Sequence, residues 1–262
     1  MSQGFGIDIG GSGIKGAVVD LETGLLVGER HKLATPKPST PEAVAAVVAE
    51  VTGHFGWRGP VGATFPAPVT GGVARTAANV DHSWIGTNIE EVLGAATGSA
   101  VTAMNDADAA GVAEAAFGAA RGHDGLVIVT TLGTGIGTAL LYRGVLIPNS
   151  ELGHLEVDGR DAELGASAGA REREDLGWGE WARRLEKYFQ ALERYLWPEL
   201  FVVGGGVSRK ADKFIDRLRL RTPIVAAGLQ NEAGIVGAAL HAALAAHAAH
   251  AALAAPAAPS EP

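Results

Sequence analysis

The sequence predicts an α/β protein made of two related halves with a cleft between them. The chain has 262 residues, which is enough for one large domain or two modest ones. Segments with the β-branched pattern of strands alternate with segments of helical pattern, as in α/β proteins. A strand, a glycine-rich turn and a second strand follow one another at residues 4–19 and again at residues 126–142, which indicates a duplicated unit.

The first half begins with two strands joined by a glycine turn. We expect strands at residues 4–9, 14–19, 25–33, 61–65 and 101–104, and helices at residues 41–55, 88–96 and 106–117. The first helix has a defined start, because Thr40 can cap its N-terminus and Pro41 suits its first position.

The second half repeats this order in outline. We expect strands at residues 126–132, 138–142 and 200–203, and helices at residues 178–196, 209–218 and 233–255. We divide the chain into a small N-terminal α/β domain (1–104) and a larger α/β domain (105–235). The helix at about 236–255 is expected to pack back on the N-terminal domain, and residues 256–262 to form a flexible tail.

Composition excludes several classes of protein. Hydrophobic residues make up 47% of the chain and charged residues 19%, so we expect a folded protein with no membrane partner. The absence of cysteine excludes a disulfide scaffold, a cysteine-ligated metal and a thiol nucleophile. The net charge of -8 argues against nucleic-acid binding. Residues 1–10 have no secretory pattern, so we expect a cytoplasmic protein.

Glycine clusters point to the functional site. There are 37 glycines, about twice the usual share of roughly 7%. Gly10, Gly11, Ser12 and Gly13 form the bend of a predicted hairpin, where backbone N–H groups can bind phosphate oxygens, and Lys15 adds a cation. Asp8 would repel phosphate unless Mg²⁺ lies between them. Taken alone, this segment is also explained by a structural turn with a solvated lysine.

The same glycines match two other phosphate-binding patterns that the context does not support. Gly11-x-Gly13-x-x-Gly16 fits the dinucleotide fingerprint, but that motif needs a helix after the glycines, whereas residues 14–19 predict a strand. A protein-kinase loop would need H-R-D and D-F-G segments, which are absent, and the chain has no Walker A motif.

Two further glycine turns follow predicted strands. The second contains Thr131, Gly133, Thr134 and Gly135, and the third contains Gly204, Gly205 and Gly206. Three such turns suit a phosphate donor that is held from two sides.

Asp106 is the candidate catalytic base. It lies where a predicted strand meets a predicted helix, where an aspartate is often only a helix cap. The helix dipole is expected to keep it ionised rather than to raise its pKa. A weak base suffices in phosphoryl transfer through a loose transition state, because the hydroxyl proton leaves late.

Four other polar residues in turn-like surroundings suit a sugar. Asn79, Glu151, His154 and Glu163 offer an amide, two carboxylates and an imidazole, which can exchange hydrogen bonds with hydroxyl groups. Each one alone could equally be a structural polar residue. Zinc at Glu151 and His154 is not expected, because no cysteine follows.

These motifs together resemble those of sugar kinases of the ROK family, which have the actin-like ATPase (ribonuclease H-like) fold. The motifs that carry the resemblance are Asp8-Ile-Gly-Gly-Ser-Gly-Ile-Lys-Gly16, Asn105-Asp106-Ala-Asp108, Leu132-Gly-Thr-Gly-Ile-Gly137, Glu151-Leu-Gly-His154 and Gly204-Gly-Gly-Val-Ser208. Within that family the chain looks most similar to the bacterial polyphosphate glucokinases, through Thr64-Phe-Pro66, Ala77-Ala-Asn79-Val-Asp81, Ser83-Trp-Ile-Gly86, Trp178-x-x-Trp181-Ala and Asn231-x-Ala-Gly-Ile-Val-Gly-Ala238.

The resemblance implies transfer of a terminal phosphoryl group from polyphosphate, ATP or both to the 6-hydroxyl of glucose, with Mg²⁺. It implies Asp106 as the base, and Asp8, Lys15 and Thr134 as residues that manage phosphate and metal. The sugar-binding residues implied are Asn79, Asn105, Glu151, His154 and Glu163. The cysteine-rich zinc motif of the wider family is missing after His154, so the sugar loop is expected to be held by packing alone.

The donor and the alternatives stay open at this stage. Polyphosphate would need a basic track, for which Lys15, Arg75, Arg171 and Arg173 are candidates, although each can be a solvated surface charge. A strictly ATP-dependent hexose kinase is one alternative. A sugar-sensing regulator is another, but such regulators carry an added DNA-binding domain before the first core strand, and here that strand is expected at about residue 4. The alanine-rich last helix and family habit favour a homodimer.

Overall fold

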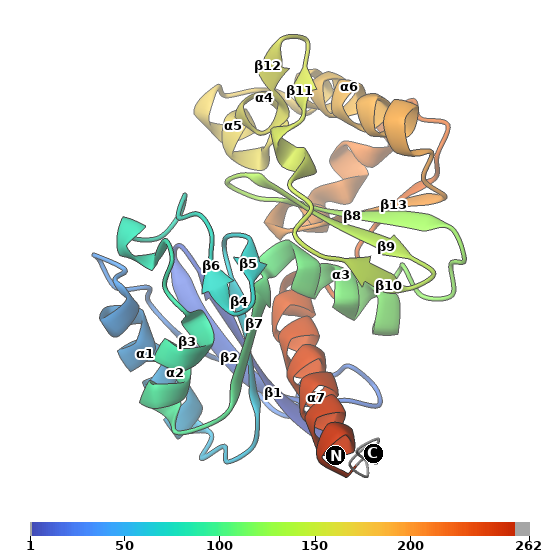
Figure 1. Cartoon of the computed structure of the whole chain (residues 1–262). Helices are drawn as coiled ribbons and strands as arrows, with labels where there is room; N and C mark the ends of the chain where they lie inside the picture. Colours follow the sequence, from blue (N-terminus) through green and yellow to red (C-terminus); the bar gives the residue numbers. More distant parts are fainter. Residues whose placement is uncertain (1, 255–262) are drawn as a thin grey trace, which may run out of the picture.

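The computed structural model describes residues 2–254 as two five-stranded sheets with helices on both faces (Figure 1). The first sheet has the order β3-β2-β1-β4-β7, with β1 at Gln3–Gly10, β2 at Gly13–Asp20, β3 at His31–Leu33, β4 at Val61–Phe65 and β7 at Val101–Asn105. The second has the order β10-β9-β8-β13-β14, with β8 at Leu126–Leu132, β9 at Ile136–Tyr142, β10 at Val145–Ile147, β13 at Leu200–Gly204 and β14 at Ile224–Ala226.

The two sheets have the same topology, which confirms the predicted duplication. In each, the first strand pairs antiparallel with the second and the second with the third, while the fourth and fifth strands run parallel to the first. A glycine-containing turn joins the first two strands in both cases. The parallel strands β1, β4 and β7 of the first sheet therefore correspond to β8, β13 and β14 of the second.

Helices cover both faces of each sheet. Helices α1 (Pro41–His54) and α2 (Ile89–Thr97) share a core with the first sheet, and α6 (Trp178–Leu196) shares one with the second. Helices α3 (Asp106–Phe117) and α7 (Ala233–Ala254) pack on each other between the halves, α7 against the first sheet and α3 against the second. The division at residues 104/105 and 235/236 stays a prediction.

Helix α7 approaches its neighbours too closely for any residue but glycine at several contacts, one of them between Gly6 of β1 and the Ile235 carbonyl oxygen, 1.9 Å from where a Cβ atom of Gly6 would be. A Cβ atom on Gly62 of β4 would lie 1.8 Å from the Ala238 carbonyl oxygen, and one on Gly237 would lie 1.9 Å from the Ala109 carbonyl oxygen. Within residues 2–254, Gln230–Ala252 is one helix long and apolar enough to cross a membrane by length and composition. It is the helix that packs on β1, β4 and α3.

Two predicted elements are wrong in part. Only His31–Leu33 of the predicted strand 25–33 is a strand, because Gly24 and Gly28 have positive φ angles and bend the chain before it. The predicted helix 209–218 is a pair of 3₁₀ segments, η3 (Gly206–Lys213) and η4 (Ile215–Arg217), with non-helical dihedral angles at Lys210. Residues 255–262, with the predicted tail, lie outside the described residues.

Several short elements were not predicted. They are the edge strands β10 and β14, the hairpins β5 (Val69–Thr70) with β6 (Val73–Ala74) and β11 (Glu156–Val157) with β12 (Arg160–Asp161), the helices α4 (Ala162–Ala166) and α5 (Ala168–Arg173), and the 3₁₀ turns η1 (His82–Trp84), η2 (Leu152–His154) and η5 (Gln230–Glu232).

Candidate active site

Asp106 lies at the point where β7 ends and α3 begins. Asn105 caps the helix, because its Oδ1 atom accepts hydrogen bonds from the backbone N–H groups of Ala107 (2.8 Å) and Asp108 (3.1 Å). Asp106 Oδ1 accepts a third bond from Ala107 N at 2.9 Å. The cap fixes the backbone on both sides of the carboxylate and thereby its direction.

The pKa of Asp106 is raised to about 7, so the expectation that the helix dipole keeps it low is wrong. Burial of the carboxyl group is the largest cause, and the negative charges of Asp8 and Glu151 add to it. The backbone hydrogen bond from Ala107 acts in the opposite direction and is outweighed. A carboxylate with a pKa near neutral pH is a more effective general base than an ordinary aspartate.

Asp8 of β1 is held from two sides. Its Oδ2 atom lies 2.6 Å from the ammonium nitrogen of Lys15, its cross-strand partner on β2. Its Oδ1 atom accepts a hydrogen bond from the hydroxyl group of the buried Thr64, at 3.0 Å. Asp8 and Lys15 therefore present one fixed carboxylate and one fixed cation beside the first glycine turn.

A cavity of about 200 Å³ lies between the two halves. Of the predicted site residues, Asp8, Lys15, Asp106, Thr131, Gly204 and Gly205 line it. Gly206, Gln230, Asn231 and Gly234 also line it, so the N-terminal end of α7 faces the cavity. The exposed backbone N–H groups and dipole of a helix N-terminus favour phosphate, as the two glycine turns do.

The second and third glycine turns touch each other. A Cβ atom on Gly205 would lie 2.5 Å from the carbonyl oxygen of Leu132, so the two backbones are in contact. Gly133 accepts a hydrogen bond from the backbone of Gly169, at 2.9 Å, which ties the second turn to α5. Gly10–Gly13 and Gly133–Gly135 do not line the 200 Å³ cavity itself.

The loop that carries Glu151 and His154 is fixed to β9 by hydrogen bonds as well as by packing, so the expectation of packing alone is wrong. The hydroxyl group of Thr138 donates to the Ser150 carbonyl (2.6 Å) and accepts from Leu152 N (3.1 Å). Gly153 lies directly on β9, where a Cβ atom would be 1.9 Å from the Ile136 carbonyl oxygen. These hydrogen bonds and this close backbone contact fix the loop on β9.

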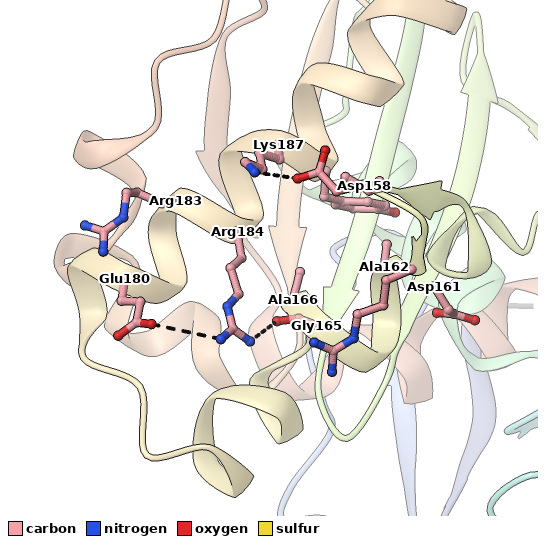
Figure 2. Close-up of a pocket in the computed structure, with 12 residues that line it drawn as sticks. Asp158, Asp161, Ala162, Gly165, Ala166, Glu180, Arg183, Arg184 and Lys187 are labelled. Carbon is pink, nitrogen blue, oxygen red and sulfur yellow. Dashed lines mark hydrogen bonds and ion pairs between the residues drawn. The ribbon is translucent and has the colours of Figure 1, made fainter.

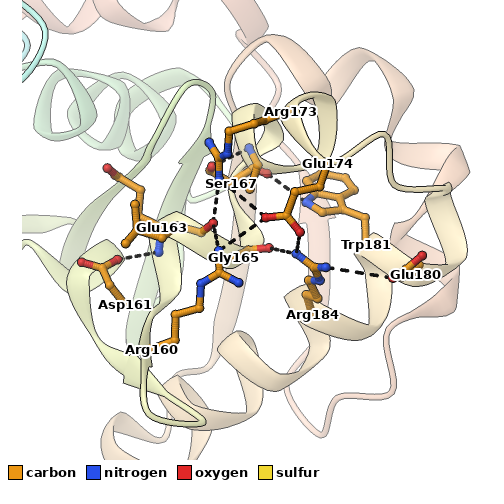
Figure 3. Close-up of polar contacts among 12 residues, drawn as sticks. Arg160, Asp161, Glu163, Gly165, Ser167, Arg173, Glu174, Glu180, Trp181 and Arg184 are labelled. Atoms are coloured by element: carbon orange, nitrogen blue, oxygen red, sulfur yellow. Dashed lines mark hydrogen bonds and ion pairs between the residues drawn. The ribbon is translucent and has the colours of Figure 1, made fainter.

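Glu151, His154 and Glu163 are electrostatic neighbours. Burial, and then the charge of Glu163, raise the pKa of Glu151. The 2.9 Å hydrogen bond that Nδ1 of His154 donates to the Asp161 carboxylate is the largest cause of the raised pKa of His154, to which Glu163 and Glu151 also contribute. Glu163 Oε2 accepts a hydrogen bond from Ile136 N at 2.8 Å, so one of its carboxylate oxygens is bound to the residue that follows the second turn. Figure 3 shows the Asp161 carboxylate beside Glu163, whose backbone N–H group donates to it at 2.8 Å.

The remaining predicted residues lie in different places. Asn79 lies beside the first turn, since a Cβ atom on Gly11 would be 3.5 Å from its carbonyl oxygen. Arg75 donates to the Thr70 carbonyl on the β5–β6 hairpin. Arg173 donates to the Leu164 carbonyl and lies 3.7 Å from Glu174.

Some residues near the site were not predicted from the sequence. Gln230 lines the cavity and was not singled out, and Asn231, which also lines it, was noted only as part of a family motif. Lys32 lies over the first turn, with its Cε atom 2.4 Å from where a Cβ atom of Gly13 would be. The pairing of β3 with β2, which puts Lys32 opposite Lys15, was the signal that could have indicated it.

A second and larger cavity, of about 540 Å³, lies over α6 and the β11–β12 hairpin (Figure 2). Its charged groups are largely paired with one another, as Figure 2 shows for Lys187 with Asp158 and for Arg184 with Glu180. None of the residues that line the interdomain cavity lines this one. The candidate active site is therefore the smaller cavity.

Comparison with known proteins agrees with this site. Residues 4–172 match the model of the ROK family. The chain is 57% identical over 239 residues to "Polyphosphate glucokinase" of Mycobacterium tuberculosis, which covers 91% of this chain and 90% of that protein. It is 54% identical to the crystal structure of inorganic polyphosphate/ATP-glucomannokinase from Arthrobacter sp. strain KM, with a TM-score of 0.91 over 94% of this chain and 100% of that one.

A more distant solved structure has the same fold. The ROK family glucokinase of Streptomyces griseus, in complex with glucose and AMPPNP, is 26% identical, with a TM-score of 0.80 over 92% of this chain and 99% of that one. The chain belongs to the ROK family, and its fold is the actin-like ATPase fold of ROK sugar kinases.

Proposed function

We propose that this chain is a polyphosphate glucokinase, which transfers a terminal phosphoryl group from inorganic polyphosphate, or from ATP, to the 6-hydroxyl of glucose. The observation that carries the proposal is Asp106, a carboxylate with a pKa of about 7 in a cavity that two glycine turns and a helix N-terminus border. The relatives named above for polyphosphate and glucose support the donor and the acceptor.

Asp106 accepts the proton of the sugar hydroxyl. The cap at Asn105 holds its carboxylate toward the cavity, and burial with two neighbouring negative charges gives it a pKa at which it is both available and basic. In phosphoryl transfer the proton leaves late, so the main contribution of Asp106 is to orient the attacking oxygen. Glucose binds on the other side of Asp106, among Asn79, Asn105, Glu151, His154 and Glu163.

The donor phosphates lie against Lys15 and the glycine turns. Backbone N–H groups of the turns and of the α7 N-terminus neutralise phosphate charge without the reorganisation that free water would require. The phosphate-binding set is Gly10, Gly11, Ser12, Gly13, Lys15, Thr131, Gly133, Thr134, Gly135, Gly204 and Gly205. Among these, Lys15, Thr131, Gly204 and Gly205 line the cavity.

The residues present fit Mg²⁺. Asp8 and Asp106 repel each other, as the raised pKa of Asp106 records, so a divalent cation at this place is favoured. Within residues 2–254 no three His, Asp or Glu side chains form a metal cluster, which suits an ion that keeps its water and is held by one or two carboxylates and substrate phosphates. Asp8 would hold it through water, and the ion would neutralise charge on the transferring phosphoryl group.

Two other properties belong to the proposal. We infer a cytoplasmic enzyme that acts as a homodimer. A second class of function is a sugar-sensing regulator without activity. The raised pKa of Asp106 argues against it, because a sugar sensor does not need a general base with a pKa near neutral pH.

The test is a comparison of donors. Purified protein with glucose and Mg²⁺ is supplied with polyphosphate or with ATP, and glucose 6-phosphate is measured by a coupled dehydrogenase assay. We expect turnover with both donors and faster turnover with polyphosphate. Faster turnover with ATP would overturn the donor preference, and no turnover with either donor would overturn the kinase assignment.

A further inference from the structure

The structure places two cations without carboxylate partners over one tryptophan, next to the phosphate-binding turns. The guanidinium carbon of Arg171 lies 3.8 Å from the centre of the Trp178 ring, and the ammonium nitrogen of Lys210 lies 5.9 Å from the same centre. Among residues 2–254 no carboxylate lies within ion-pair distance of either side chain. The Nε atom of Arg171 is buried and has no hydrogen-bond partner in that part of the chain.

Four other cations of the second half are paired with carboxylates. Figure 3 shows Arg160, Arg173 and Arg184 gathered around Glu174, at 3.4, 3.7 and 2.7 Å. Lys187 is paired with Asp158 (Figure 2). An anion would have to break these pairs to bind there, whereas Arg171 and Lys210 are free to accept one.

Each of the two cations is joined to one phosphate-binding turn. Arg171 is on α5, whose Gly169 N–H group donates to the Gly133 carbonyl of the second turn. Lys210 is on η3, which begins directly after the third turn at Gly206. The second and third turns contact each other through Leu132 and Gly205. Both cations therefore lie on segments that are joined to the second and third turns, and neither of them lines the interdomain cavity.

The Trp178 ring is held in place by aromatic packing. Its ring stacks on Phe214, with centres 6.2 Å apart and planes 9° apart, and meets the edge of Trp181 at 5.8 Å. Trp181 is buried and donates hydrogen bonds to the carbonyls of Ala166 and Ser167. Contact with a packed aromatic ring restricts the Arg171 side chain, so an anionic ligand has less of it to order on binding.

We infer that Arg171 and Lys210 bind the part of a linear polyphosphate chain that extends beyond the transferred phosphoryl group, with Trp178 holding the two cations in place. The inference rests on the proposed function. A linear polyanion is the ligand that this pair of cations fits, because both cations lack a carboxylate partner and lie outside the cavity, on segments joined to the turns. Arginine adds a planar fork of donors for phosphate oxygens.

The test compares donors of different length. The wild type, R171A, K210A and the double variant are assayed with long-chain polyphosphate, tripolyphosphate and ATP. Each single variant is expected to raise KM for long-chain polyphosphate about tenfold, the scale of one charge-assisted contact, and the double variant to raise it further. KM for tripolyphosphate and ATP, and kcat, are expected to stay close to the wild-type values. R183A is the control, since Arg183 lies on α6 in the larger cavity.

A second readout does not depend on turnover. Binding of long-chain polyphosphate to the unreacted protein is followed by tryptophan fluorescence, and the double variant is expected to bind more weakly and with a smaller dependence on salt concentration. Equal losses with ATP and with long-chain polyphosphate, or no loss with either, would overturn the inference. If the wild type does not use polyphosphate but turns over ATP, the donor assignment fails; if it uses polyphosphate and the variants are unchanged, only the track fails.

Discussion

At the scale of single residues, Asp106 as the proposed base is expected to set the pH dependence of activity. A base must be deprotonated to accept a proton, so kcat/KM for glucose is expected to rise with pH through about 7 and then to level off. Because the charge of Glu151 helps to raise this pKa, Glu151→Gln is expected to move the acidic limb to lower pH as well as to weaken glucose binding. The measurement is the pH profile of kcat/KM for both proteins.

Glu172→Gln is the matched control for that profile, because Glu172 is exposed on α5 and does not contribute to the pKa of Asp106. Its acidic limb is expected to coincide with that of the wild type. A Glu151→Gln limb that stays in place would show that the carboxylate of Glu151 does not act on Asp106.

The same pKa has a consequence for stability. The folded-state pKa of Asp106, about 7, is above the value of 3.8 for an unperturbed aspartate, so the folded state keeps its proton as pH rises from about 4 to 7 while the unfolded state loses it. The folded state is therefore progressively destabilised over that range. Asp106→Asn removes this penalty and is expected to increase the free energy of unfolding at pH 8 by about 2–4 kcal/mol, with little change near pH 4.

Urea denaturation of wild type and Asp106→Asn at the two pH values measures this difference. Asparagine can still accept the Ala107 hydrogen bond, so the cap geometry is preserved. An equal or lower stability of the variant at pH 8 would contradict the raised pKa.

Sequence reasoning located Asp106 but misjudged its pKa. The position followed from a strand, an asparagine and an aspartate in order, which is local information. The pKa depends on Asp8, which is 98 residues away in the chain and on another strand, and on burial by the second half. Asp161 was missed for the same reason, since only the folded β12–α4 segment brings it to His154.

At the scale of elements, helix α3 is anchored by one buried carboxylate. Glu114 is fully buried, and its oxygens accept hydrogen bonds from the backbone N–H groups of Ala119 (2.7 Å), Gly228 (3.0 Å) and Leu229 (2.8 Å). The last two hold the segment that leads to Gln230 and Asn231 in the cavity. Glu114 therefore links the end of α3 to the start of η5 and α7.

Glu114→Ala leaves three partly buried N–H groups without an acceptor. It is expected to lower the free energy of unfolding by about 3 kcal/mol, since each unsatisfied group costs about 1–3 kcal/mol and relaxation recovers part. Urea denaturation measures the loss, with Glu172→Ala on the exposed face of α5 as the control. A change below about 0.5 kcal/mol, the range of surface substitutions, would contradict this role.

The long periodic elements were predictable, and the short ones were not. Helix α1 begins at Pro41 with the Thr40 side chain accepting from Ala43 N, as local capping preferences predict. The segment 209–218 was predicted as one helix, whereas it forms the 3₁₀ segments η3 and η4, with non-helical dihedral angles at Lys210. The two-residue hairpins have no pattern that a sequence could show, since contacts with other elements stabilise them.

At the scale of the whole molecule, one asparagine joins the two halves beside the sugar loop. The side chain of Asn149 accepts from Val69 N (2.8 Å) and donates to the Val69 carbonyl (2.9 Å) of β5, in the first half. Its own N–H group donates to the buried carboxylate of Asp108 on α3, at 2.7 Å. Asn149 has a φ angle of 58°, a conformation that asparagine tolerates better than most residues.

Asn149→Gly keeps this backbone conformation and removes both contacts with Val69. It is expected to raise KM for glucose about tenfold with a smaller effect on kcat, because two hydrogen bonds of about 1 kcal/mol each no longer hold the halves at the sugar site. Asn149→Asp, which keeps the acceptor for Val69 N, is expected to fall between the glycine variant and the wild type. Steady-state kinetics with varied glucose measures KM for each variant. An unchanged KM in the glycine variant would contradict the role of the Asn149–Val69 contact in glucose binding.

The duplicated architecture itself could be predicted from sequence, because each half carries its own strand, turn and strand. The distance between the halves could not, since it depends on contacts such as that of Asn149 with Val69, 80 residues apart in the chain. The same holds for the close approach of α7 to β4.

The most direct measurement of the central claim separates turnover from glucose binding in Asp106→Asn. Glucose affinity is measured by isothermal titration calorimetry, and turnover with polyphosphate or ATP by formation of glucose 6-phosphate. We expect glucose to bind with nearly wild-type affinity and turnover to fall by orders of magnitude, about 10²-fold or more for the loss of a general base. Near-normal turnover in this variant would contradict the assignment of Asp106 as the residue that receives the proton of the sugar.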